Sequence, residues 1–140
     1  MKTTDQAKEM VKLTGGTLAE IHYLSIHDIE LADFGGSIIH IGLGAHRRDV
    51  IVHDSDLPQQ LWEEALNYSD PYIFRNASRY FDETPQRAIF AKRKYNEYAL
   101  NGKNDYTDPV TGETYDSLAL QLVARTMAIS VDEVIRLLQQ

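Results

Sequence analysis

The chain has 140 residues, a mass of 15.9 kDa and an ordinary globular composition, with 43% hydrophobic and 25% charged residues. Its formal net charge of −7 argues against a general nucleic-acid binder, and the lack of cysteine excludes disulfides, thiolate zinc sites, iron–sulfur clusters and cysteine nucleophiles. Because there is no long apolar run and no signal-peptide pattern, we expect one soluble domain over residues 1–140, in a reducing cytoplasm and without a membrane partner.

Residues 1–55 hold all five histidines and six of the eight glycines, and their pattern predicts a short helix followed by a small sheet. The helix is expected over residues 4–13, with its end marked by Gly15-Gly16. Alternating apolar residues predict strands over 17–24, 26–31, 37–43 and 50–52, with a tight turn at Gly35-Gly36. We therefore expect an antiparallel meander of three to four strands.

Residues 56–140 have the periodicity of helices. Leu57-Pro58 is a helix start, with Asp56 as a candidate cap, and further helices are predicted over 70–81, 84–100 and 115–127. A capping box at residues 130–133 predicts a last helix that runs to the C-terminus, and turn residues predict a loop over 105–112. The fold class is therefore predicted to be α+β, an antiparallel sheet packed against a helical bundle.

The spacing of the five histidines gives little indication of a metal site or of catalysis. No His-x-His or His-x-x-x-His pair exists, so no metal site is expected. His53-Asp-Ser55 has the His-x-Ser form that two-histidine phosphoesterases use, but those enzymes need two copies and this chain has one. A small phosphodiesterase using His53 and Ser55 stays an alternative hypothesis.

Residues 122–138 match the apolar pattern of a helix-turn-helix, which makes a DNA-binding regulator the second alternative. The helix that would read DNA begins Val131-Asp132-Glu133, and carboxylates at that position repel phosphates. It also lacks the side chains at its start that recognise base edges. We therefore interpret this motif as a packed helical corner.

The strongest signal is the mixture of aromatic and basic residues over 72–103. Residues 72–98 hold seven of the thirteen aromatic residues, and residues 75–103 hold seven basic residues but only three acidic ones. Aromatic faces stack on nucleobases, and guanidinium groups bind phosphates or stack on the other face of a base. The pattern therefore favours binding of a nucleotide-like anion, against the alternative of core aromatics with a solvated basic face.

This layout resembles the phage anti-Thoeris sponges, the first type of Thoeris anti-defence protein. The similarity spans residues 17–140 and rests on residues 70–81, Lys94-Tyr-Asn-Glu-Tyr98 and Val123-Ala-Arg125. The resemblance implies a non-catalytic protein, phage-encoded and acting in the host cytoplasm, that sequesters a cyclic ADP-ribose isomer. Cyclic oligonucleotides are further possible ligands, and the protein needs no cofactor. It also implies a site at the interface of a homodimer or higher oligomer.

Carried over from the resemblance, Arg125 is the arginine that stacks on adenine and Tyr98 its aromatic partner, with Phe81 the second choice. Arg79 and Arg87 are the candidates for phosphate contacts. The candidate ligand-binding set is completed by Ala124, Arg75 and Asp108.

Overall fold

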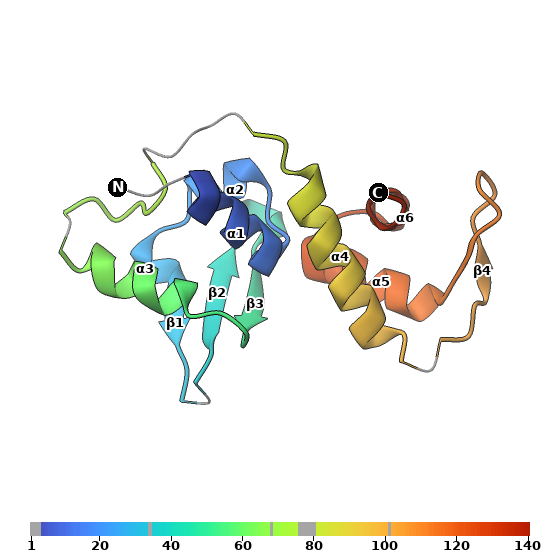
Figure 1. Cartoon of the computed structure of the whole chain (residues 1–140), viewed down its shortest axis with the longest axis horizontal. Coiled ribbons are helices and arrows are strands. Elements are labelled where there is room, and N and C mark those ends of the chain that lie inside the picture. Colours follow the sequence, from blue (N-terminus) through green and yellow to red (C-terminus); the bar gives the residue numbers. More distant parts are fainter. Residues whose placement is uncertain (1–3, 34, 68, 76–80, 101) are drawn as a thin grey trace.

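The computed structural model describes residues 4–33, 35–67, 69–75, 81–100 and 102–140, and it confirms the α+β class. A three-stranded antiparallel sheet and the first helices form one end of an elongated molecule, and helices α4 to α6 with a short hairpin form the other (Figure 1). Within these residues, none of the helices is both long and apolar enough to cross a bilayer.

The first helix is where the sequence predicted it, but the second element is not a strand. Helix α1 (Thr4–Thr14) is followed by helix α2 (Leu18–His22). The Thr17 hydroxyl accepts a hydrogen bond from the Glu20 N–H, and the Glu20 carboxylate accepts one from the Thr17 N–H. This reciprocal capping box starts a helix, so the strand predicted over 17–24 is wrong.

The sheet consists of strands β1 (Ile29–Leu31), β2 (Ser37–Ile41) and β3 (Arg48–Val52), in that order. A 3-10 helix, η1 (Ile26–Asp28), replaces the first half of the predicted strand 26–31, and η2 (Gly44–His46) lies in the turn between β2 and β3. Across the sheet, Ile29 pairs with Ile39 and Ile39 with Val50, and all three are buried. The meander is thus confirmed with three strands.

Helix α3 (Leu57–Ala65) begins at the predicted Leu57-Pro58, although Asp56 makes no side-chain cap. Instead the Ser55 hydroxyl accepts a hydrogen bond from the Leu57 N–H. The helix predicted over 70–81 is wrong for residues 70–75. Tyr72 forms an isolated β-bridge with Ser25, and the Asp70 carboxylate accepts from the Tyr72 N–H, so the backbone is tied down as a turn. Residues 76–80 of that prediction lie outside the described residues.

The second half begins with helix α4 (Thr84–Tyr98) and ends with α5 (Ser117–Met127) and α6 (Val131–Leu138), all close to the predicted spans. The predicted loop holds a small hairpin of β4 (Tyr106–Thr107) and β5 (Thr114–Tyr115). As predicted, the Ser130 hydroxyl caps α6 by accepting from the Glu133 N–H.

Helix α1 packs against α4 and joins the two halves into one hydrophobic core. Gly15, which follows α1, has φ +71, and a Cβ there would lie 2.4 Å from Cδ1 of Phe90. Two arginines of α4 donate to backbone carbonyls at this end of α1, Arg87 Nε to Gly15 and Arg93 to Lys12 and Leu13. These bonds satisfy carbonyls that a helix end leaves without partners.

Candidate ligand-binding site

The structure places Tyr98 and Arg125 at one hollow between β3, α4 and α5, which we call the β3–α4–α5 pocket. Its volume is about 350 Å³. Consecutive residues of β3 form one wall and the two helices form the other, and the lining residues are Arg48, Asp49, Val50, Ile51, Lys94, Tyr98, Arg125 and Thr126. Ala124, the neighbour of Arg125 in sequence, is buried and does not line the pocket.

Tyr98 is held in place by a chain of hydrogen bonds. The Thr126 hydroxyl donates to the carbonyl of Leu122 at 2.8 Å, one turn back along α5. This bond uses the one hydroxyl hydrogen of Thr126. The Tyr98 hydroxyl, 3.0 Å away, is therefore the donor in the contact between the two side chains, and the Thr126 oxygen is the acceptor. Tyr98 is 37% exposed, so its ring is fixed at one end and still accessible to a ligand.

The basic side chains that line the pocket differ in whether an acidic side chain balances their charge. Arg48 forms a nearly buried ion pair with Glu20, with N···O distances of 2.7 and 3.1 Å. Lys94 lies 3.1 Å from Glu97 on the same helix. Arg125 is exposed and forms neither a hydrogen bond nor an ion pair with the residues that the structure describes. Arg125 is therefore the charge with the most to gain from an anionic ligand.

The Arg48–Glu20 pair stands between this pocket and a second hollow of about 340 Å³, because Arg48 lines the first and Glu20 the second. Burial alone would raise the pKa of Glu20, but the hydrogen bonds from Arg48 and from the Thr17 backbone outweigh it and lower the pKa. Arg87 lines the second hollow, and burial lowers its pKa. Arg87 is thus near the β3–α4–α5 pocket but outside it, bound to Gly15.

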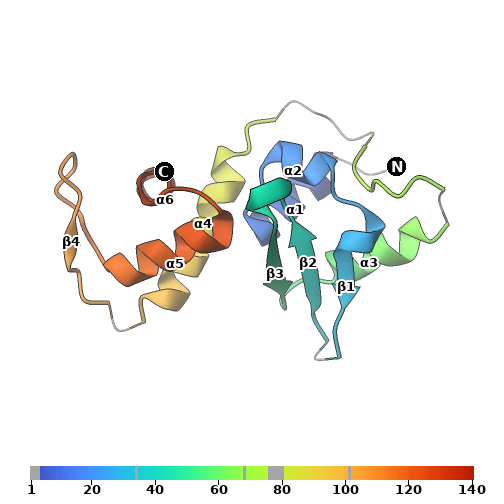
Figure 2. The same ribbon diagram turned by 180° about the vertical axis from the view of Figure 1, so that it is seen from behind.

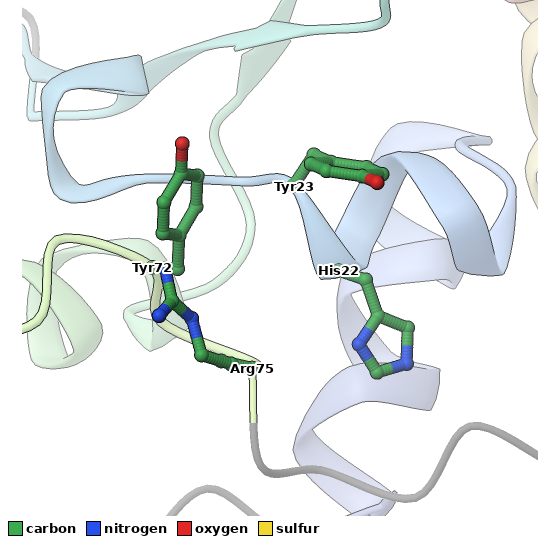
Figure 3. Close-up of a pocket in the computed structure, with 4 residues that line it drawn as sticks. All are labelled: His22, Tyr23, Tyr72 and Arg75. Atoms are coloured by element: carbon green, nitrogen blue, oxygen red, sulfur yellow. The ribbon is translucent and has the colours of Figure 1, made fainter.

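Arg75 lines a different hollow, of about 500 Å³, with His22, Tyr23 and Tyr72 (Figure 3). Its guanidinium carbon lies 4.6 Å from the centre of the Tyr72 ring, and its Nε is 3.3 Å from the Asp70 carboxylate. The guanidinium group of Arg75 is therefore already in contact with an aromatic ring and with a carboxylate.

The other predicted residues do not meet at the pocket either. Phe81 lines a hollow beside α2 and lies under the ammonium group of Lys8, 5.6 Å from the ring centre. Asp108 is buried in the β4–β5 hairpin, where hydrogen bonds from Gln139 and Thr111 lower its pKa. Arg79 lies outside the described residues.

The predicted ligand-binding set missed six of the eight described lining residues: Arg48, Asp49, Val50, Ile51, Lys94 and Thr126. Arg48 is separated in sequence from the aromatic and basic segment, and nothing in its local pattern marks it. Thr126 follows Arg125 directly, but its role depends on the hydroxyl of Tyr98, which is 28 residues away.

The phosphodiesterase alternative rests on His53 and Ser55. Ser55 uses its hydroxyl to cap α3, and His53 is exposed. Among the described residues, no three histidine or acidic side chains are placed to hold a metal ion. Comparison of the chain with known protein families and with curated proteins finds no match, so a function has to be argued from this geometry.

Proposed function

We propose that this protein is a non-catalytic sponge that sequesters a cyclic ADP-ribose isomer in the β3–α4–α5 pocket and so blocks bacterial anti-phage immunity. The observation that carries the proposal is that an anchored aromatic ring, Tyr98, lines the same hollow as Arg125, whose guanidinium has no ion-pair partner among the described residues. The ring offers a face on which adenine stacks, and the guanidinium binds phosphate or covers the other face.

The hydroxyl groups of the pocket favour binding over hydrolysis. Those of Tyr98 and Thr126 bond to each other and to a backbone carbonyl, so neither is paired with a base that would make it a nucleophile. The Asp49 carboxylate at the pocket is hydrogen-bonded to His40 at 2.6 Å. What the described side chains of the pocket offer a ligand is therefore charge and an aromatic face.

The pocket of one chain is small for a whole cyclic ADP-ribose isomer. Its volume of about 350 Å³ is near the lower end of the range for ligand pockets, roughly 300–1,000 Å³. A second copy of the chain would enclose the rest of the ligand, and we therefore propose a homodimer. Sedimentation at micromolar concentration tests this, and a single species of 15.9 kDa with and without ligand would contradict a shared site.

Incubation of the purified protein with cyclic ADP-ribose isomers made by a TIR-domain protein tests the function. We expect the ligand to co-purify with the protein and to return with unchanged mass after heat denaturation. Recovery of a cleaved product would contradict the sponge and support a phosphodiesterase. An absence of binding to all isomers would overturn the proposed ligand class.

DNA binding is the second candidate, because the helical corner is formed as such a motif requires. Ala128 ends α5 in the left-handed conformation, and Ser130, two residues after it, is the N-cap of α6. Asp132 and Glu133 are exposed at the start of α6, which works against phosphate contacts. A gel shift at low salt, where phosphate-driven affinity is greatest, would detect such binding; we expect none.

A further inference from the structure

Strand β3 is the edge of the sheet, and its outer side faces the ligand pocket. In the strand order β1-β2-β3, no described strand pairs with that side. Both views of the molecule show β3 as the strand nearest to α4 and α5 (Figures 1 and 2). An edge strand presents N–H and C=O groups that are free to bind a further partner.

The hydrogen-bond pattern of the sheet determines which residues present these groups. Opposed residues in antiparallel strands alternate between pairs that exchange hydrogen bonds and pairs that do not. The Ala32 N–H donates to the carbonyl of Gly36, so Gly36, Ile38 and His40 bond toward β1. The residues that alternate with them direct their backbone hydrogen bonds toward β3, where their partners are Arg48, Val50 and Val52.

Asp49 and Ile51 therefore direct their backbone groups away from the sheet. Burial reports the separate alternation of the side chains, because Val50 on the core face is 2% exposed whereas Ile51 on the opposite face is 49% exposed. Arg48, Asp49, Val50 and Ile51 all line the pocket although their side chains alternate between the two faces of the sheet. Both faces meet only at the strand edge, so the edge itself forms the pocket wall.

We infer that this strand edge recognises the adenine base, with the Asp49 carbonyl accepting from the N6 amine and the Ile51 N–H donating to N1. The ligand is then an isomer whose ring closes through the riboses, because closure through N1 would leave that nitrogen without a lone pair. The inference rests on the proposed function and deepens it by assigning the specificity for the base. The edge of adenine has a donor beside an acceptor, which complements a carbonyl and an N–H on the same side of a strand. Tyr98 lines the same pocket, so its ring is available to stack on the face of the base.

The side chain of Asp49 supports this arrangement. Asp49 Oδ1 lies 2.6 Å from His40 Nδ1, and His40 Nε2 lies 3.0 Å from Glu30, so β3 is tied to β2 and β1 beside the pocket. A strand edge held in this way offers its backbone groups in a fixed position. A fixed donor and acceptor discriminate against bases that lack the matching groups.

Calorimetry of the unmodified protein with AMP analogues tests the inference. 1,N6-Ethenoadenosine monophosphate blocks N1 and N6 together, whereas 7-deaza-AMP changes only N7, on the neighbouring edge of the base, and leaves N1 and the N6 amine intact. We expect AMP and 7-deaza-AMP to bind within about threefold of each other and the etheno analogue to bind roughly tenfold or more weakly, since two hydrogen bonds are lost. In amide NMR spectra, AMP but not the etheno analogue should shift the Ile51 signal.

The outcomes separate this inference from the proposed function. If cyclic ADP-ribose isomers bind but the etheno analogue binds as well as AMP, the strand edge does not recognise adenine and the sponge proposal stands. If the isomers bind but AMP fails to compete with them at millimolar concentration, recognition of the base is likewise overturned. If no adenine nucleotide binds, both proposals fail.

Discussion

Arg125 and Tyr98 reach the same pocket from different helices and are prepared for a ligand in different ways. Tyr98 is fixed through Thr126, while Arg125 keeps its charge unpaired among the described residues. Arginines that looked equivalent in the sequence have other tasks, since Arg87 and Arg93 bind carbonyls at the end of α1 and Arg75 stacks on Tyr72. Residue type alone therefore identifies the arginines that could bind phosphate. The contacts of each side chain in the structure show which of them is available to do so.

Arg125→Ala should remove most of the nucleotide affinity and leave the stability unchanged, because the side chain is exposed and makes no described contact. Loss of a cation–π contact and a charge-assisted hydrogen bond corresponds to about 2–4 kcal/mol, or roughly 30–1,000-fold in affinity. Arg125→Lys should recover little of it, because an ammonium group has no stacking plane.

Calorimetry with a cyclic ADP-ribose isomer measures both Arg125 variants, and Arg136→Ala is the matched control. Arg136 is an exposed arginine on α6 that does not line the pocket. Its replacement should leave the affinity within about twofold of the unmodified protein, as expected for a surface change. Unchanged affinity in Arg125→Ala would remove this residue from the site.

At the scale of elements, helix α2 shows how a local cap overrides an alternating pattern. Residues 17–24 alternate in polarity like a strand, but Thr17 and Glu20 cap each other and start a helix. The alternation spans too few residues to outweigh these bonds. Glu20 is then placed to pair with Arg48 at the wall of the pocket.

Thr17→Ala should lower the free energy of unfolding by about 1 kcal/mol, because the Glu20 N–H loses its acceptor. Thr17→Ser keeps the hydroxyl and should stay close to the unmodified protein. Urea denaturation of the two variants measures the difference. Equal stability of Thr17→Ala and Thr17→Ser would show that the cap contributes nothing.

The sheet should be slightly more stable at mildly acidic than at alkaline pH. The hydrogen bond with Asp49 raises the pKa of His40, burial opposes this by less, and the bond with Glu30 adds a further, smaller increase. Protonated His40 thus stabilises the folded state fully below its unfolded pKa of about 6.5, and the contribution is lost as the pH rises through the higher folded value.

His40→Gln should remove this pH dependence. We expect a contribution of less than about 1 kcal/mol, because the three side chains are partly exposed to solvent. Urea denaturation of the unmodified protein and of His40→Gln, from about pH 5.5 to pH 8.5, measures this contribution as the difference between their free energies of unfolding. A difference that stays constant over this range would contradict the assigned pKa direction.

At the scale of the whole molecule, the interface between α1 and α4 positions the pocket, because α4 supplies Lys94 and Tyr98 while the sheet below α1 supplies β3. Gly15 lets α4 approach closely, since its missing side chain leaves room for Phe90. The arginines of α4 that bind the end of α1 reinforce the same contact.

Gly15→Ala should destabilise the protein by about 2–4 kcal/mol, from the strain of a positive φ and from the clash with Phe90. Gly112→Ala is the control, because it has a similar φ, +76, and open space where the methyl group would lie. The excess cost of Gly15→Ala over Gly112→Ala in thermal unfolding measures the packing alone. Equal losses would show that the interface tolerates the added methyl group.

The sequence by itself determined the elements whose signals are local. Prolines in the first turn began α3 and α4, Ser130 capped α6, and Gly35-Gly36 separated the first strands of the sheet. Such signals act between residues a few positions apart, so a linear pattern contains them. The α+β class followed, because alternation in the first part and helical periodicity in the second persist along the chain.

Only the tertiary structure decided which candidates share a site. Tyr98 and Thr126 meet across 28 residues, and Arg48 joins them from an edge strand, whereas Phe81, Arg75 and Asp108 are drawn to other contacts. Packing of α1 against α4, which depends on the space left by Gly15, sets these distances. The physical reason is that charge and stacking act through space, and the position of each group in space depends on the whole core rather than on its neighbours in sequence.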